Sequence, residues 1–92
     1  MIVRISTEGQ YAVSEADTAG LNELDNAAVS ACETADEAGF RDVFGRLLDY
    51  VRTHGTAVSA DELTGSDIIL PPPDVSLKEA QSEFRGEGLI PG

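Results

Sequence analysis

The chain is short and strongly acidic, and these two properties already exclude several classes of protein. Its 92 residues carry 17 Asp and Glu against 6 Lys and Arg, a formal net charge of −11 at pH 7. Such a charge repels nucleic acid and anionic lipid headgroups and favours basic partners, although solubility or adaptation to high salt is an alternative reason for it. The length predicts one domain, residues 1–92, with a modest core and no room for a deep catalytic cleft.

Two short alternating segments at the start of the chain predict a β-hairpin. Residues 2–6 and 10–14 alternate apolar and polar side chains. The three residues between them end in Gly9, which suits a turn closed by a left-handed glycine. One face of this hairpin is apolar and is expected to be buried. The register set by this turn pairs Ser6 with Gln10, Ile5 with Tyr11, and Val3 with Val13.

Residues 17–54 predict two amphipathic helices packed on each other, around which the rest of the chain is expected to fold. Asp17 and Thr18 are candidate caps of the first helix, and its polar residues, Asp25 among them, are expected mostly on the solvent side. Apolar residues recur every three or four positions in both helices. These stripes are Leu21, Leu24, Ala28, Ala31, Ala35 and Ala38, then Phe40, Val43, Phe44, Leu47, Leu48 and Val51.

The ends of the second helix carry recognisable signals. Acidic Asp36-Glu37 marks the turn before it, where negative charge suits a helix N-terminus. The helix is expected to end at His54, with Gly55 in the left-handed conformation that often follows a helix. A coiled-coil partner is the alternative use of the two stripes, but each stripe finds a mate within the chain.

The last third of the chain predicts short elements. Residues 56–58 can be extended, and Ser59 precedes a single helical turn over residues 60–63. Residues 67–70 (DIIL) are the candidate for a further strand, which three prolines then end. Ser76 and Glu79 form a capping box for a short helix to about Phe84. The predicted class is α+β: an N-terminal β-hairpin, extended by a third strand near 67–70, packed on an antiparallel two-helix hairpin, with a short C-terminal helix.

No arrangement typical of catalysis, metal binding or cofactor binding is found in the sequence. His54 is the sole histidine, and Cys32 the sole cysteine, so a disulfide within the chain and a cysteine metal cluster are excluded. We expect Cys32 to be a small, partly buried apolar residue. A small enzyme, which would need a pocket around His54 or the Asp61-Glu62 pair, is the least favoured hypothesis.

The compartment expected from the sequence is the cytoplasm. One cysteine fits a reducing environment, the N-terminus enters a strand pattern without a signal peptide, and no apolar run is long enough to cross a membrane. Direct membrane insertion and nucleic-acid binding are therefore not expected. A peripheral position at a membrane, reached through a partner, is compatible with these features.

Several stretches together resemble the PspA-associated protein family (PspAA). They are the opening MIVRI..EGQY.V, LNELDNA in the first helix, LL..VR..G in the second, then DEL..SDIILPP.D.SL.E and the closing GEGLIPG. The resemblance covers essentially the whole chain and is most specific over residues 61–92. It implies a non-enzymatic partner of the membrane-stress protein PspA in the envelope stress response, without cofactors and without catalytic residues to transfer.

Two interpretations of the interaction surface stay open at this point. An adaptor would present acidic side chains to a basic face of PspA, with Asp61, Glu62, Asp67 and Asp74 as the candidate partner-binding residues. A self-assembling homodimer without direct PspA contact would instead pair free sheet edges. The tail leaves a similar choice, since Leu89 and Ile90 would be buried if it docks and exposed if it is a recognition peptide; docking is favoured.

Overall fold

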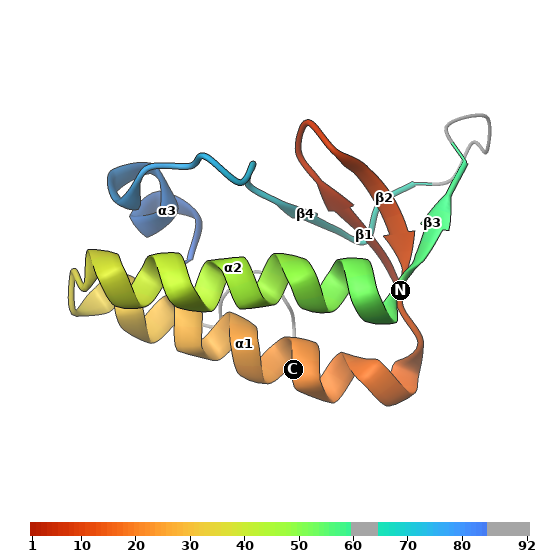
Figure 1. Ribbon diagram of the computed structural model, residues 1–92, viewed down its shortest axis with the longest axis horizontal. Coiled ribbons are helices and arrows are strands. Elements are labelled where there is room, and N and C mark those ends of the chain that lie inside the picture. Colours follow the sequence, from red (N-terminus) through yellow and green to blue (C-terminus); the bar gives the residue numbers. More distant parts are fainter. Residues whose placement is uncertain (60–64, 85–92) are drawn as a thin grey trace.

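The computed structural model describes residues 1–59 and 65–84, which fold into a sheet packed on a helical hairpin (Figure 1). The α+β class is confirmed, with the short helix at one end of the hairpin. In chain order the elements are β1 (Ile2–Ile5), β2 (Gly9–Ala12), α1 (Glu15–Glu33), α2 (Glu37–His54), β3 (Thr56–Val58), β4 (Ile68–Leu70) and α3 (Leu77–Glu83).

The described residues form a four-stranded mixed sheet in the order β3-β2-β1-β4. The third strand expected near 67–70 is present as β4, and it runs parallel to β1. The short segment at 56–58 is also a strand, β3, and lies antiparallel to β2. The sheet therefore has the N-terminal hairpin at its centre and strands from the second half of the chain at both edges.

The hairpin register differs from the prediction by two residues. Val3 pairs with Tyr11 and Ile5 with Gly9, so the turn is Ser6–Glu8. Thr7 adopts a φ of 71°, and the Glu8 N–H donates to the Ile5 carbonyl at 3.0 Å. The turn therefore comprises residues 6–8, one residue earlier than the predicted turn 7–9.

The face of the hairpin that was predicted to be buried is nevertheless correct, because side chains along a strand alternate with a period of two. A two-residue shift keeps every side chain on its face of the sheet. Val3, Ile5 and Val13 are buried against the helices, while Arg4 on the other face is exposed.

The core lies between the sheet and the helical hairpin and ends in an aromatic triangle. Phe40 and Phe44 stack at 5.3 Å between ring centroids, and Phe84 meets each of them edge-on at 5.9 Å. Phe84 directly follows α3, so this helix is held to α2 by aromatic contacts. Gln81 also donates from Nε2 to the Cys32 carbonyl at 3.0 Å, which ties α3 to α1.

The helix ends agree with the sequence at the turn and disagree at the start. Asp36 caps α2, accepting from the Gly39 N–H at 3.0 Å. The first helix begins at Glu15 after Ser14, so the prediction that Asp17 and Thr18 cap it was wrong. Both lie inside the first turn, where the Thr18 hydroxyl donates back to the Ser14 carbonyl at 3.0 Å.

Gly55 ends α2 as predicted, but its conformation is extended rather than left-handed. Its φ is −83° and its ψ is 159°, which any residue can adopt. Glycine is needed there for space, because an added Cβ would lie 2.5 Å from the Val51 carbonyl oxygen and 2.9 Å from the Tyr11 Cβ. The chain thus passes from α2 into β3 in close contact with β2.

Asp25 is the clearest departure from the predicted helix pattern. It was expected on the solvent side of α1, yet it is fully buried on the same stripe as Leu21, Ala28 and Cys32. Asp25 has an interaction partner, and no buried side-chain nitrogen or oxygen of residues 1–59 and 65–84 lacks a hydrogen-bond partner. A satisfied buried carboxylate fixes α1 in one rotation about its axis.

Gly55→Ala should lower the free energy of unfolding by about 1–3 kcal/mol, the usual range for overpacking. Gly45→Ala is the matched control, because nothing lies within 4 Å of its added Cβ. Alanine should stabilise the helix interior there by up to about 1 kcal/mol. Urea unfolding measures both, and equal stability of the two variants would contradict the tight contact at Gly55.

Asp25→Ala should lower the free energy of unfolding by about 1–3 kcal/mol, because it removes a fully buried polar side chain whose interactions are satisfied. Glu23→Ala, two residues earlier on the exposed side of the same helix, should stay within about 0.5 kcal/mol of the parent. Thermal unfolding followed by circular dichroism compares the two. An Asp25→Ala protein as stable as Glu23→Ala would show that the carboxylate contributes nothing to the core.

Candidate functional site

The outer edge of β4 is where the described residues leave the sheet open. β4 lies at one end of the strand order, and within residues 1–59 and 65–84 no strand pairs with its outer side. Ile69, at its centre, is 57% exposed and is the large hydrophobic residue that the described surface leaves most accessible. An exposed apolar residue on a strand edge is a common mark of an interaction site.

The backbone of Ile69 faces this open side. The Ser6 N–H donates to the Leu70 carbonyl at 3.0 Å, so Leu70 directs its backbone groups toward β1. Alternate residues of a parallel strand bond to the same neighbour. Ile68 and Leu70 therefore face β1, and the N–H and C=O of Ile69 point away from it.

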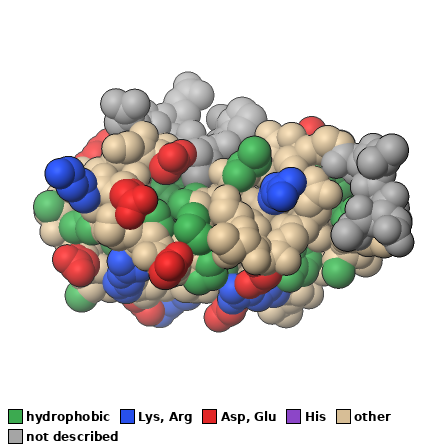
Figure 2. All heavy atoms as spheres, turned by 90° about the horizontal axis from the view of Figure 1, so that it is seen from above, with side chains coloured by type: hydrophobic (Ala, Val, Ile, Leu, Met, Phe, Trp, Pro, Cys, Tyr) green, Lys and Arg blue, Asp and Glu red, His purple; other side chains and the backbone are tan. Residues whose placement is uncertain are grey.

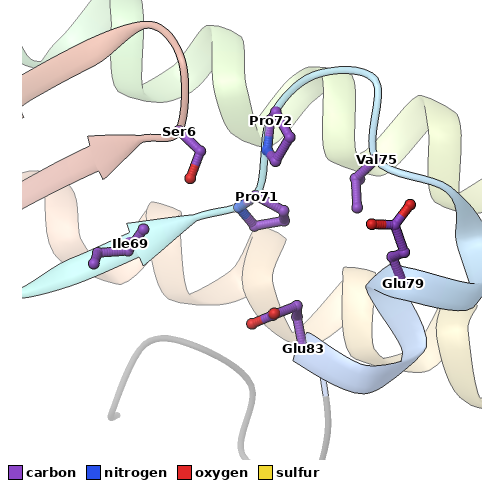
Figure 3. A pocket seen from close by; sticks show the side chains of 7 residues that line it. All are labelled: Ser6, Ile69, Pro71, Pro72, Val75, Glu79 and Glu83. Carbon is purple, nitrogen blue, oxygen red and sulfur yellow. The ribbon is translucent and has the colours of Figure 1, made fainter.

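A groove of about 160 Å³ lies beside this edge, between the end of β4 and α3 (Figure 3). Its apolar part is made by Ile69, Pro71, Pro72 and Val75, which the sequence places together because the prolines end the strand and turn the chain toward α3. The volume is close to that of an engineered cavity that holds a benzene ring. The groove is therefore large enough for one side chain of a partner.

Two carboxylates from α3 border the groove. Glu79 and Glu83 are four residues apart, which places them on one face of the helix, and both are exposed. Ser76 holds Glu79 in place: its hydroxyl donates to Glu79 Oε1 at 3.0 Å, and its Oγ accepts from the Glu79 N–H at 3.1 Å. This confirms the predicted cap of α3. Figure 2 shows the same side of the molecule, where a patch of hydrophobic side chains lies between acidic ones.

The acidic residues expected to bind a partner do not gather at this groove. Asp61 and Glu62 lie outside the described residues, as do the predicted turn at 60–63 and the tail residues Leu89 and Ile90. Asp67 is exposed but engaged: its Oδ2 accepts from the Ile2 N–H at 2.7 Å, and its own N–H donates to the Ile2 carbonyl at 2.8 Å. It therefore anchors the start of β4 to β1.

Asp74 and the groove residues complete the comparison with the sequence. Asp74 is exposed in the turn between Pro72 and Val75 and does not line the groove. Sequence reasoning missed Ile69, Glu79 and Glu83 as site residues. The alternation of a strand could have indicated that Ile69 is exposed, since its side chain must lie on the face opposite to Ile68 and Leu70. The i, i+4 spacing could have indicated that Glu79 and Glu83 share one face of their helix.

Cys32 and His54, the described residues that were considered for chemistry, lie in structural positions. Burial raises the pKa of the Cys32 thiol, which disfavours the thiolate. The His54 ring stacks on Tyr50 at 4.0 Å between centroids, at the end of α2. In the part of the chain that the structure describes, no three His, Cys, Asp or Glu side chains are grouped to hold a metal ion.

Among the described residues, the ion pair with the shortest contact joins the hairpin turn to α2, and neither of its residues lines the groove. Arg52 donates to Glu8 through Nε, at 2.9 Å to Oε2, and through Nη2, at 2.6 Å to Oε1, while Nη1 reaches Asp49 at 3.0 Å. The Arg52 hydrogen bonds hold the pKa of Glu8 below its usual value, and burial raises the pKa of Tyr11, which donates to the same carboxylate. This cluster is structural, since its charges are already paired.

These features define a small α+β protein whose described surface offers an acidic groove at an open sheet edge. The chain belongs to the family described as PspA-Associated protein, whose family model matches residues 1–92. Comparison with curated proteins and with solved structures gives no match. Among the described residues, no helix is long and apolar enough to cross a membrane.

Glu8→Gln should lower the free energy of unfolding by about 0.5–1 kcal/mol at neutral pH, the upper part of the range for partly exposed pairs. Folding lowers the pKa of Glu8. The ion pair therefore contributes its full stability above the pKa of Glu8 in the unfolded chain, about 4.3, and this contribution is lost as the pH falls through the lower pKa of Glu8 in the folded protein. Urea unfolding at several pH values should show the difference disappearing in acid. A difference that grows in acid would contradict this assignment.

Proposed function

We propose that this protein is a non-enzymatic adaptor that binds PspA, or a related membrane-stress protein, in the response to envelope stress. Membership of the PspA-associated family across residues 1–92 is the observation that carries the proposal. The family description names PspA as the associated protein. The proposal further includes the role in stress and a cytoplasmic location, from which the protein reaches the membrane through its partner.

The absence of an enzymatic role is likewise proposed from the state of the reactive side chains. A nucleophile needs a base and a third group that orients it. Cys32 is buried among alanines of α1, with a raised thiol pKa, and His54 is stacked on Tyr50 at the far end of the hairpin. Neither has the surroundings that activate such groups.

The groove at β4 supports an interaction role. It combines an exposed isoleucine, an open strand edge and two carboxylates within one small area. The chain as a whole carries a net charge of −11, so a basic surface on a partner would be attracted over a distance and then held by local contacts.

A homodimer is the second candidate, and the two open sheet edges favour it. β3 and β4 each lack a neighbouring strand on their outer side among the described residues. In an antiparallel β4–β4 pair, however, the C-terminal end of one strand, beside which Glu83 of α3 lines the groove, would face Asp67 at the start of the other strand. Two copies with a net charge of −11 each would also repel, so a heterologous basic partner fits this edge better than a second copy does.

The proposed function predicts direct binding to purified PspA that weakens as salt increases, because screening acts on exposed charges. Titration calorimetry at about 50 mM and about 300 mM salt should show the affinity falling several-fold. An unrelated helical protein of similar basic charge is the control and should bind more weakly. No binding to PspA at low salt, or equal binding to the control, would overturn the proposal.

A further inference from the structure

We infer that the β4 edge accepts one extended segment of the partner as an added strand, with a Lys or Arg of that segment seated in the groove between β4 and α3. The inference rests on the proposed function, since it assigns the chemistry of the partner at that same site. It concerns an extended basic segment, and not a helix, an anionic surface or a second copy of this chain.

The backbone geometry favours a strand over other occupants. The outward N–H and C=O of Ile69 form a donor and an acceptor in the plane of the sheet, which an added strand satisfies together. β4 has three residues, and Pro71 after it offers no N–H. The added strand therefore pairs over a short length and takes much of its affinity from the side chain in the groove.

The groove selects the type of side chain. Its floor of Ile69, Pro71 and Val75 is apolar, and its rim carries Glu79 and Glu83. A lysine or arginine matches both parts, because its aliphatic stem covers apolar surface while its charged head stays at the rim. Arg4 pairs in register with Ile69 but lies one strand further from the edge, and neither Arg4 nor Lys78 of α3 lines the groove.

The opposite edge of the sheet provides an internal control. Met1 and Val13 exchange backbone hydrogen bonds of 3.0 and 2.8 Å, so Tyr11, two residues before Val13, also bonds to β1. Its β3 partner Ala57 then points its N–H and C=O outward, as Ile69 does on β4. The groove with its glutamates, however, lies at β4.

The first experiment uses two blocked pentapeptides, Thr-Val-Lys-Val-Thr and Thr-Val-Glu-Val-Thr, titrated into the full chain and followed by amide chemical shifts. The lysine peptide should bind about fivefold more tightly, the effect of one partly exposed ion pair. The shifted amides should be those of β4 and α3. Equal binding of the two peptides, or shifts centred on β3, would overturn the inference.

Two sets of variants test the backbone and the carboxylates separately. Ile69→Pro removes the outward N–H and should abolish binding of the lysine peptide, whereas Ala57→Pro, the matched change at β3, should leave it unchanged. The double variant Glu79→Lys/Glu83→Lys should reverse the preference toward the glutamate peptide. Glu23→Lys/Glu33→Lys alters the total charge by the same amount on α1 and should keep the original preference, which controls for the change in net charge.

The outcomes separate this inference from the proposed function. If PspA binds the parent and Ile69→Pro equally well, the adaptor role stands and the strand-addition site is wrong. If PspA does not bind but the lysine peptide does so at β4, the site stands and the partner is wrong. If the full-length variant Leu89→Asp/Ile90→Asp binds the lysine peptide far more tightly than the parent, the chain's own tail is the occupant and the inference is overturned.

Discussion

The sheet has one apolar face, and the need to cover that face governs the rest of the structure. Val3, Ile5 and Leu70 are fully buried against α1 and α2, and the two-stranded hairpin β1–β2 at the centre of the sheet would be marginal on its own. The long helices can cover one face only. The other face, and the two edge strands that the second half of the chain adds, stay accessible in the described part of the molecule (Figure 1).

This one-sided arrangement explains why the candidate site lies at β4. Alternation along three residues buries Ile68 and Leu70 and exposes Ile69, so the strand that completes the core also presents an apolar residue outward. The prolines that end the strand then turn the chain into α3, whose fixed position depends on Phe84 in the aromatic triangle. Core packing and the proposed binding groove therefore share the same short segment.

Hydrophobic periodicity predicted the elements well, and physical details that leave little trace in the pattern caused the errors. The apolar stripe from Phe40 to Val51 specified α2, and an even-numbered register error left the buried face of the hairpin unchanged. The burial of Asp25 could not be predicted, because an Asp side chain on a helix is normally solvated. Its burial is tolerated only because the side chain has an interaction partner inside the fold, which the sequence pattern does not reveal. The role of Gly55 depends on the distance to Tyr11, which no local pattern contains. The acidic composition indicated a basic partner, but it could not select Glu79 and Glu83, since their meeting with Ile69 arises from the packing of α3.

The central claim is that Ile69 offers its backbone to a partner at an open sheet edge, and residue-resolved amide hydrogen exchange tests it most directly. In the free protein the Ile69 amide should exchange rapidly while the amides of Leu70 and Arg4, inside the sheet, are protected. Addition of PspA should slow exchange at Ile69 more than at Ala57 on the opposite edge. An Ile69 amide as protected as that of Leu70 in the free protein would contradict the account, because the edge would then already be occupied.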